Sequence, residues 1–115
     1  MKTYTGLLSI DSYGEADDIL FLSTLSGPFA EEMDWMQNKN VTVRYWITDK
    51  EASKEEAQEA FIGSLMGEAD VDFGSRYSEL TGYLWTDEEL NIGDHDLIER
   101  LKSSVGMWLI LEVEA

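Results

Sequence analysis

The clearest hydrophobic pattern lies in residues 41–48. β-Branched and aromatic side chains recur there at every second position: Val41, Val43, Tyr45 and Ile47. This alternation predicts a strand with these four side chains on one face. Residues 107–113 are apolar at almost every position, which is typical of a strand covered on both sides. We therefore expect this second strand to lie at the centre of a sheet.

Between these two segments, the spacing predicts a helix over roughly residues 50–66. Two candidate capping boxes precede it, formed by Thr48 with Glu51 and by Ser53 with Glu56. Apolar residues follow at helical spacing and would form its buried stripe: Ala57, Ala60, Phe61 and Leu65. Gly67 suits the C-terminal end of such a helix. We expect Phe61 and Leu65 to be core residues.

The next segments complete the pattern. Residues 69–77 alternate again and predict a strand, residues 80–85 predict another, and residues 86–93 are expected to form an acidic loop. Asp94 is the expected cap of a second helix, which Gly106 would end. The inner face of that helix is predicted to carry Leu97, Ile98 and Leu101.

From residue 41 the predicted order is therefore β-α-β-β-α-β. This order is that of the ferredoxin-like unit, so we expect an α+β fold over residues 41–114 with a mainly antiparallel sheet. Residues 1–40 would be a β-rich N-terminal extension. They contain predicted strands at 3–10 and 19–25, a charged loop at 11–18, and a short helix or irregular strand at 29–37. A chain of 115 residues fits a single domain, 1–115.

Charge changes the picture more than any motif. The chain has 24 acidic and 8 basic residues, which gives a formal net charge of −16. Hydrophobic residues make up 43% of the chain, so we expect a folded protein. Such a surface repels nucleic acid and anionic membranes, and we expect neither as a direct partner. The lack of cysteine and of an apolar leader at the start favours a cytoplasmic protein.

The acidic residues gather in two parts of the chain. No Lys or Arg occurs in residues 3–38, and the second part covers residues 87–96. We expect both parts, together with Trp35, to bind a basic protein surface. The candidate partner-binding residues are Asp11, Glu15, Asp17, Asp18, Glu31, Glu32, Asp34, Trp35, Asp87, Glu88, Glu89, Asp94 and Asp96. Trp35 either is exposed beside Met33 and Met36 as an apolar contact or covers the sheet, and the sequence leaves both open.

Candidate catalytic and metal-binding residues are few. His95 is the only histidine, and the favoured interpretation places it in the first turn of the second helix. With no cysteine, one histidine does not make a zinc site. Asp70 and Asp72 resemble the start of a calcium loop, but Ser75 and Thr81 occupy its glycine and glutamate positions. We expect no cofactor, no metal and no enzymatic activity.

In its size, its acidity and its lack of catalytic motifs, the chain resembles the acidic DNA-mimic inhibitors that phages encode. The features that carry the resemblance are the stretch without basic residues at 11–34 and the cluster at 87–96. It implies an anti-restriction or anti-CRISPR type of protein that blocks a host nucleic-acid-binding partner.

Two other functions stay open. One is an immunity protein that neutralises a nuclease toxin. The other is a ligand-binding or enzymatic ferredoxin-like domain, which a deep pocket containing Asp70, Asp72 or His95 would favour. The oligomeric state is open as well.

Overall fold

Strands dominate the computed structural model, which describes residues 1–14, 16–77, 79–82 and 84–115, with side chains for all of these except 75–77 and 84–87. The strands are β1 (Lys2–Tyr13), β2 (Ala16–Leu22), β3 (Asn40–Thr48), β4 (Phe61–Tyr77), β5 (Leu84–Ile92), β6 (His95–Asp96) and β7 (Trp108–Glu114). The helical elements are α1 (Phe29–Glu32), α2 (Leu97–Lys102) and two 3₁₀ turns, η1 (Asp34–Met36) and η2 (Gln58–Ala60). Over the described residues the strands form one sheet in the order β2-β1-β7-β3-β4-β5-β6, and every pair is antiparallel.

This order corrects the predicted fold class. The antiparallel sheet is present, but the ferredoxin-like β-α-β-β-α-β arrangement over residues 41–114 is wrong, and the molecule is mainly sheet. The strand at 41–48 and the central position of the last strand are confirmed, since β7 pairs with β1 on one side and β3 on the other. The predicted loop at 11–18 is instead mostly the hairpin of β1 and β2.

The predicted helix at 50–66 fails after one turn. Its second capping box does form, because the backbone N–H of Ser53 donates to Glu56 Oε1 at 3.1 Å and that of Glu56 donates to Ser53 Oγ at 3.3 Å. The chain then enters β4, where pairing with β3 outweighs helical spacing. Leu65 is a core residue as expected, at 4% exposed, but Phe61 is 46% exposed and the prediction that it is core is wrong.

The C-terminal predictions are partly right. Residues 86–93 are not a loop, because β5 continues through Ile92. The second helix exists as α2, and its predicted inner residues Leu97, Ile98 and Leu101 are buried. Its N-cap is Asp96, which accepts a hydrogen bond from the backbone N–H of Glu99 at 3.0 Å, and not Asp94.

Two long strands bend at glycines. Residues 2–7 of β1 pair with β7 and residues from 8 onward pair with β2, and a Cβ on Gly6 would lie 2.9 Å from Leu22 Cγ. Residues 61–68 of β4 pair with β3 and residues 69–77 pair with β5. Gly67 has φ +148, and a Cβ there would lie 2.7 Å from the Cα of Gly93. Only glycine fits such an approach at this φ.

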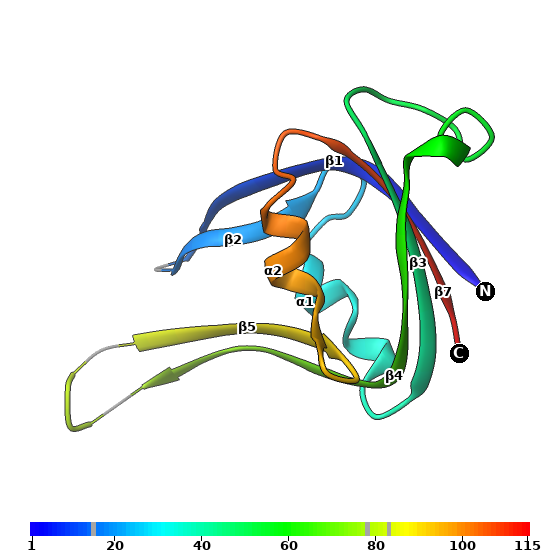
Figure 1. The fold of residues 1–115 in the computed structure, drawn as a ribbon. Coiled ribbons are helices and arrows are strands. Elements are labelled where there is room, and N and C mark those ends of the chain that lie inside the picture. Colours follow the sequence, from blue (N-terminus) through cyan, green and yellow to red (C-terminus); the bar gives the residue numbers. More distant parts are fainter. Residues whose placement is uncertain (15, 78, 83) are drawn as a thin grey trace.

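The bends fold two hairpins, β1–β2 and β4–β5, over one face of the central strands, with both helices in the space between them (Figure 1). The core fills this space with residues from the sheet and from α1 and α2, including Leu20, Phe29, Leu90 and Leu101. On the opposite face of the central strands, Trp46, Ala57 and Ile110 form a smaller buried cluster beneath residues 49–60. No helix of the described residues is long and apolar enough to cross a membrane.

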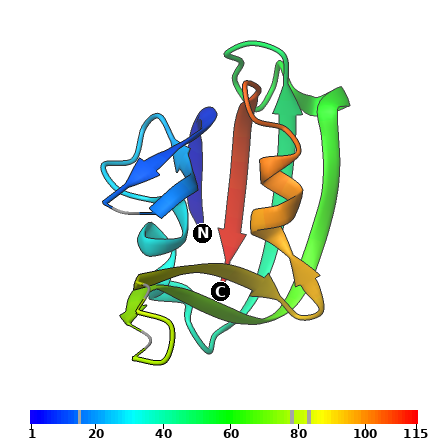
Figure 2. The ribbon, with the colours of Figure 1, turned by 90° about the vertical axis from the view of Figure 1, so that its left-hand side faces the viewer.

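The two hairpins meet through side chains. The backbone N–H of Leu20 in β2 donates to Glu88 Oε2 in β5 at 2.8 Å. The rings of Tyr13 and Phe73 contact each other edge to face, with centroids 5.7 Å apart. These contacts join the β1–β2 hairpin to the β4–β5 hairpin, and both hairpins lie on the same side of the central strands (Figures 1 and 2).

Candidate acidic interface

The fold uses many of its basic side chains for its own contacts. Lys54 Nζ lies 2.8 Å from Oε2 of Glu112, which is buried on β7. Lys102 Nζ lies 2.6 Å from Oε1 of Glu88, without the angle of a hydrogen bond. A buried carboxylate needs such a partner. Both lysines therefore form ion pairs with inward-facing carboxylates.

Three further basic residues are held at the surface. Arg44 pairs with Glu114 at 3.5 Å, Lys2 lies 4.3 Å above the ring of Trp35, and Arg100 contacts Nδ1 of His95 at 2.9 Å. These five basic side chains thus make contacts within the molecule. Most of the described acidic side chains, by contrast, are exposed.

The first predicted acidic part is divided between two places. Asp11, Asp17 and Asp18 are exposed on the β1–β2 hairpin, where Asp18 has φ +60, a left-handed conformation that Asp tolerates better than most residues. Glu15 was predicted for the same surface, but it lies outside the described residues. Glu31 and Asp34 are exposed on α1 and η1.

Glu32 and Trp35 have structural contacts. Glu32 Oε1 accepts hydrogen bonds from Ser26 Oγ and from the backbone N–H of Gly27, both at 3.2 Å. Trp35 is half-buried and packs against the core, which matches the alternative that it covers the sheet. Met33 and Met36, its proposed companions in an exposed contact, are fully buried.

Trp35 also fixes Tyr4. Its Nε1–H donates to the Tyr4 hydroxyl at 2.9 Å. Burial raises the pKa of Tyr4 above its usual 10.0, the hydrogen bond from Trp35 lowers the pKa in part, and the nearby charge of Glu32 raises it further. The hydroxyl is therefore held in its neutral form by its surroundings.

The second acidic part separates in the same way. Glu88 points inward and is 5% exposed, whereas Glu89 is exposed. The side chain of Asp87 lies outside the described residues. Asp94 and His95 are exposed beside α2, and Asp96 caps that helix. His95 lies on β6 rather than in the first helical turn as predicted.

The structure places Asp70 and Asp72, which the predicted list lacked, beside the predicted residue Glu89. On the β4–β5 hairpin, Val71 and Leu90 pair and point into the core, so Asp72 and Glu89, the next pair, lie on the outer face. Asp70 is exposed on the same face and accepts a hydrogen bond from Gln37 Nε2 at 3.4 Å. We call Asp70, Asp72 and Glu89 the hairpin acidic face. The alternation of the sequence around Asp70 and Asp72 indicated that these two side chains share a face. Only the pairing of β4 with β5 places Glu89 beside them.

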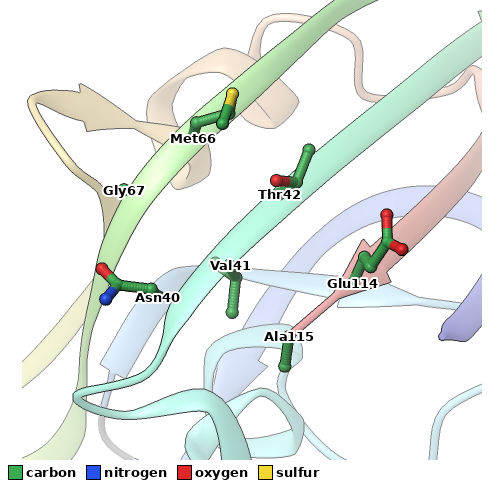
Figure 3. Close-up of a pocket in the computed structure, with 7 residues that line it drawn as sticks. All are labelled: Asn40, Val41, Thr42, Met66, Gly67, Glu114 and Ala115. Atoms are coloured by element: carbon green, nitrogen blue, oxygen red, sulfur yellow. The ribbon is translucent and has the colours of Figure 1, made fainter.

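Two shallow depressions are open to solvent. One, of about 430 Å³, lies over the C-terminal end of β7 and contains residues such as Thr42, Met66 and Glu114 (Figure 3). The other lies beside Trp108 and includes Glu51 and Glu56. Neither includes Asp70, Asp72 or His95. Among the residues described, no group of three or more His, Cys, Asp or Glu side chains could hold a metal ion.

Comparisons of the chain with protein-family models, with curated proteins and with solved structures found no match. The surface of the molecule is therefore the basis for inferring its function.

Proposed function

We propose that this protein is a non-enzymatic inhibitor that binds the basic, nucleic-acid-binding surface of another protein. The observation that carries the proposal is the unequal use of charge. Lys54 and Lys102 are paired with inward-facing acids, while Asp70 and Glu89 are exposed on one hairpin face. A basic surface would be attracted to this side of the molecule, and the attraction would accelerate association.

The spacing of the hairpin acidic face supports a phosphate-like role. Asp70 and Asp72 are two residues apart on one strand, which corresponds to about 6.8 Å. This is twice the roughly 3.4 Å axial spacing of phosphates in one DNA strand. Asp72 and Glu89 are also cross-strand partners, which brings carboxylates of β4 and β5 together on this face.

The partner we propose is a nucleic-acid-binding protein of a host defence system, as the resemblance to phage DNA mimics implies. The test is a binding panel measured by surface plasmon resonance, with a purified restriction endonuclease, a CRISPR effector complex and a DNase toxin. We expect tight binding to a member of the defence group, weakening with salt, and displacement by double-stranded DNA. Binding to the toxin alone would favour an immunity protein instead.

Charge-reversal variants test whether the position of the acidic residues, and not only their number, determines binding. The variant Asp70→Lys with Glu89→Lys should slow association strongly, because both residues are exposed and exposed charges act on encounter more than on dissociation. The matched control is Glu51→Lys with Glu55→Lys, which changes the same charge on exposed residues elsewhere. Equal losses in both variants would mean that net charge matters and placement does not. Binding that DNA does not displace would contradict the proposal.

A further inference from the structure

One edge of β4 is open, and it is separate from the hairpin acidic face. Residues 61–68 pair with β3 on one side, and β5 pairs only with residues 69–77. Within the described part of the chain, no strand therefore lies on the other side of residues 61–66. Figure 2 shows this part of β4 at the border of the sheet.

The backbone of this edge is directed outward at known positions. The N–H of Ala69 donates to the Lys39 carbonyl and its own carbonyl accepts from Asn38, each at 2.9 Å, so Ala69 faces the β3 side. The Glu68 carbonyl points the opposite way and accepts from the N–H of Gly93 at 3.0 Å. Because these directions alternate along an antiparallel ladder, Ser64 and Met66 direct their N–H and C=O groups to the open edge.

The edge lacks the usual protection. Natural edge strands carry charges or proline, or are covered by other segments. Residues 60–67 contain neither a charged residue nor a proline, although the chain is 28% charged. Phe61 is 46% exposed, Ile62 55% and Met66 71%. The one protective feature is the irregularity in register opposite Tyr45 and Trp46, at the start of the strand.

Charge decides what could pair there. Glu59 and Glu68 are exposed at the two ends of this apolar edge. Two copies of the chain paired antiparallel about Ser64 would bring Glu59 of one copy close to Glu68 of the other, and each copy carries −16. A second copy is therefore a poor occupant. An extended segment with basic residues at both ends would have the complementary charge.

We propose that the edge of β4 at residues 61–66 binds an extended segment of a partner protein as an additional antiparallel strand. The segment would alternate apolar residues and carry Lys or Arg at each end. Main-chain hydrogen bonds to Ser64 and Met66 would supply affinity, as in other cases of strand addition. Glu59 and Glu68 would fix its position through exposed, salt-sensitive ion pairs.

The test uses a short peptide of alternating Thr and Val with Lys at both ends, added to the full ¹⁵N-labelled chain. We expect it to slow amide hydrogen exchange at Ser64 and Met66 and to bind less tightly as salt is added. Ser64→Pro removes the outward N–H and should weaken binding roughly tenfold. Ser64→Ala, which keeps that N–H, should bind as the native chain does.

A second arm does not depend on the folding of the proline variant. The same peptide with N-methyl groups at alternate residues cannot pair through its backbone, and we expect its binding to be lost. Equal binding of both peptides would overturn the proposal, as would protection confined to the edges of β2 or β5. A stable dimer of the native chain in sedimentation, abolished by Ser64→Pro, would show a second copy as the occupant and would also overturn it.

Discussion

Glu88 and Glu89 show how completely two identical neighbours can differ. Glu88 turns inward, where its carboxylate accepts the N–H of Leu20 and lies beside Lys102. Glu89 turns outward next to Asp72. The first carboxylate holds two hairpins and a helix together, and the second adds to the surface charge.

Removal of the Glu88 side chain should therefore destabilise the protein far more than removal of the Glu89 side chain. We expect Glu88→Ala to lower the free energy of unfolding by about 2–3 kcal/mol, because Lys102 and the N–H of Leu20 lose their partner; the 29% exposure of Lys102 moderates the loss. Glu89→Ala should change stability by less than about 0.5 kcal/mol. Urea unfolding of both variants measures the difference, and equal values would mean that Glu88 does not hold the two hairpins together.

Tyr4 gives a prediction about pH. Its pKa in the folded state is raised above the usual 10.0, mainly by burial. A raised pKa means that the neutral hydroxyl stabilises the fold below the unfolded pKa, and that this contribution disappears as the pH rises through the folded pKa. The native chain should lose stability above pH 10, and Tyr4→Phe should lose less over the same interval. Denaturant melts at several alkaline pH values, with tyrosinate absorbance as a second signal, measure both.

At the scale of elements, the bends of β1 and β4 decide the architecture. Each strand serves the central sheet with its first half and a hairpin with its second. A straight β4 would carry Val71 and its neighbours away from the core. The glycines at the bends are therefore important for the architecture, because a side chain at Gly6 or Gly67 would meet neighbouring atoms.

Two glycines of β4 provide a matched comparison. We expect Gly67→Ala to destabilise the protein by roughly 2–4 kcal/mol, because the added Cβ meets Gly93 and the φ of +148 is strained for alanine. Gly74→Ala adds a Cβ with no atom within 4 Å and should change stability by less than about 1 kcal/mol. Thermal unfolding of the two variants checks the order, and a reversed order would contradict the bend.

The same elements show what sequence patterns can and cannot predict. β3 and β7 were predictable because their burial produces alternation or a continuous apolar run. β5 was not, because its inward position 88 is a glutamate whose partner, Lys102, comes from a distant segment. The helix at 50–66 was predicted from real local signals, since the Ser53–Glu56 box forms, but long-range pairing decided the rest.

The candidate site was also predictable only in part, because some of its residues have roles that depend on long-range contacts. Exposed acids such as Asp11, Asp17 and Glu31 needed only composition. The buried or capping roles of Glu32, Glu88 and Asp96 depend on tertiary neighbours. The hairpin acidic face required the register of β4 against β5, which composition does not contain.

For the whole molecule, the net charge of −16 opposes folding. We expect the melting temperature at neutral pH to rise as NaCl increases from about 10 mM to about 500 mM, because salt screens exposed carboxylates more than the buried pairs of Glu88 and Glu112. Scanning calorimetry measures this shift. The variant with Asp70→Lys and Glu89→Lys should gain less from salt than the native chain, and an unchanged melting temperature in the native chain would show that the repulsion is negligible.

The position of β7 has a consequence for biosynthesis. β7 lies between β1 and β3, so Lys2 is paired with Val113 across almost the whole sequence. A ribosome must therefore have delivered residue 114 to the folding chain before the central strands can join. Until then β1 to β4 are present with unpaired edges, a state in which polypeptides aggregate. The abundant carboxylates of the earlier segments are already present at that stage, and their mutual repulsion keeps nascent chains apart.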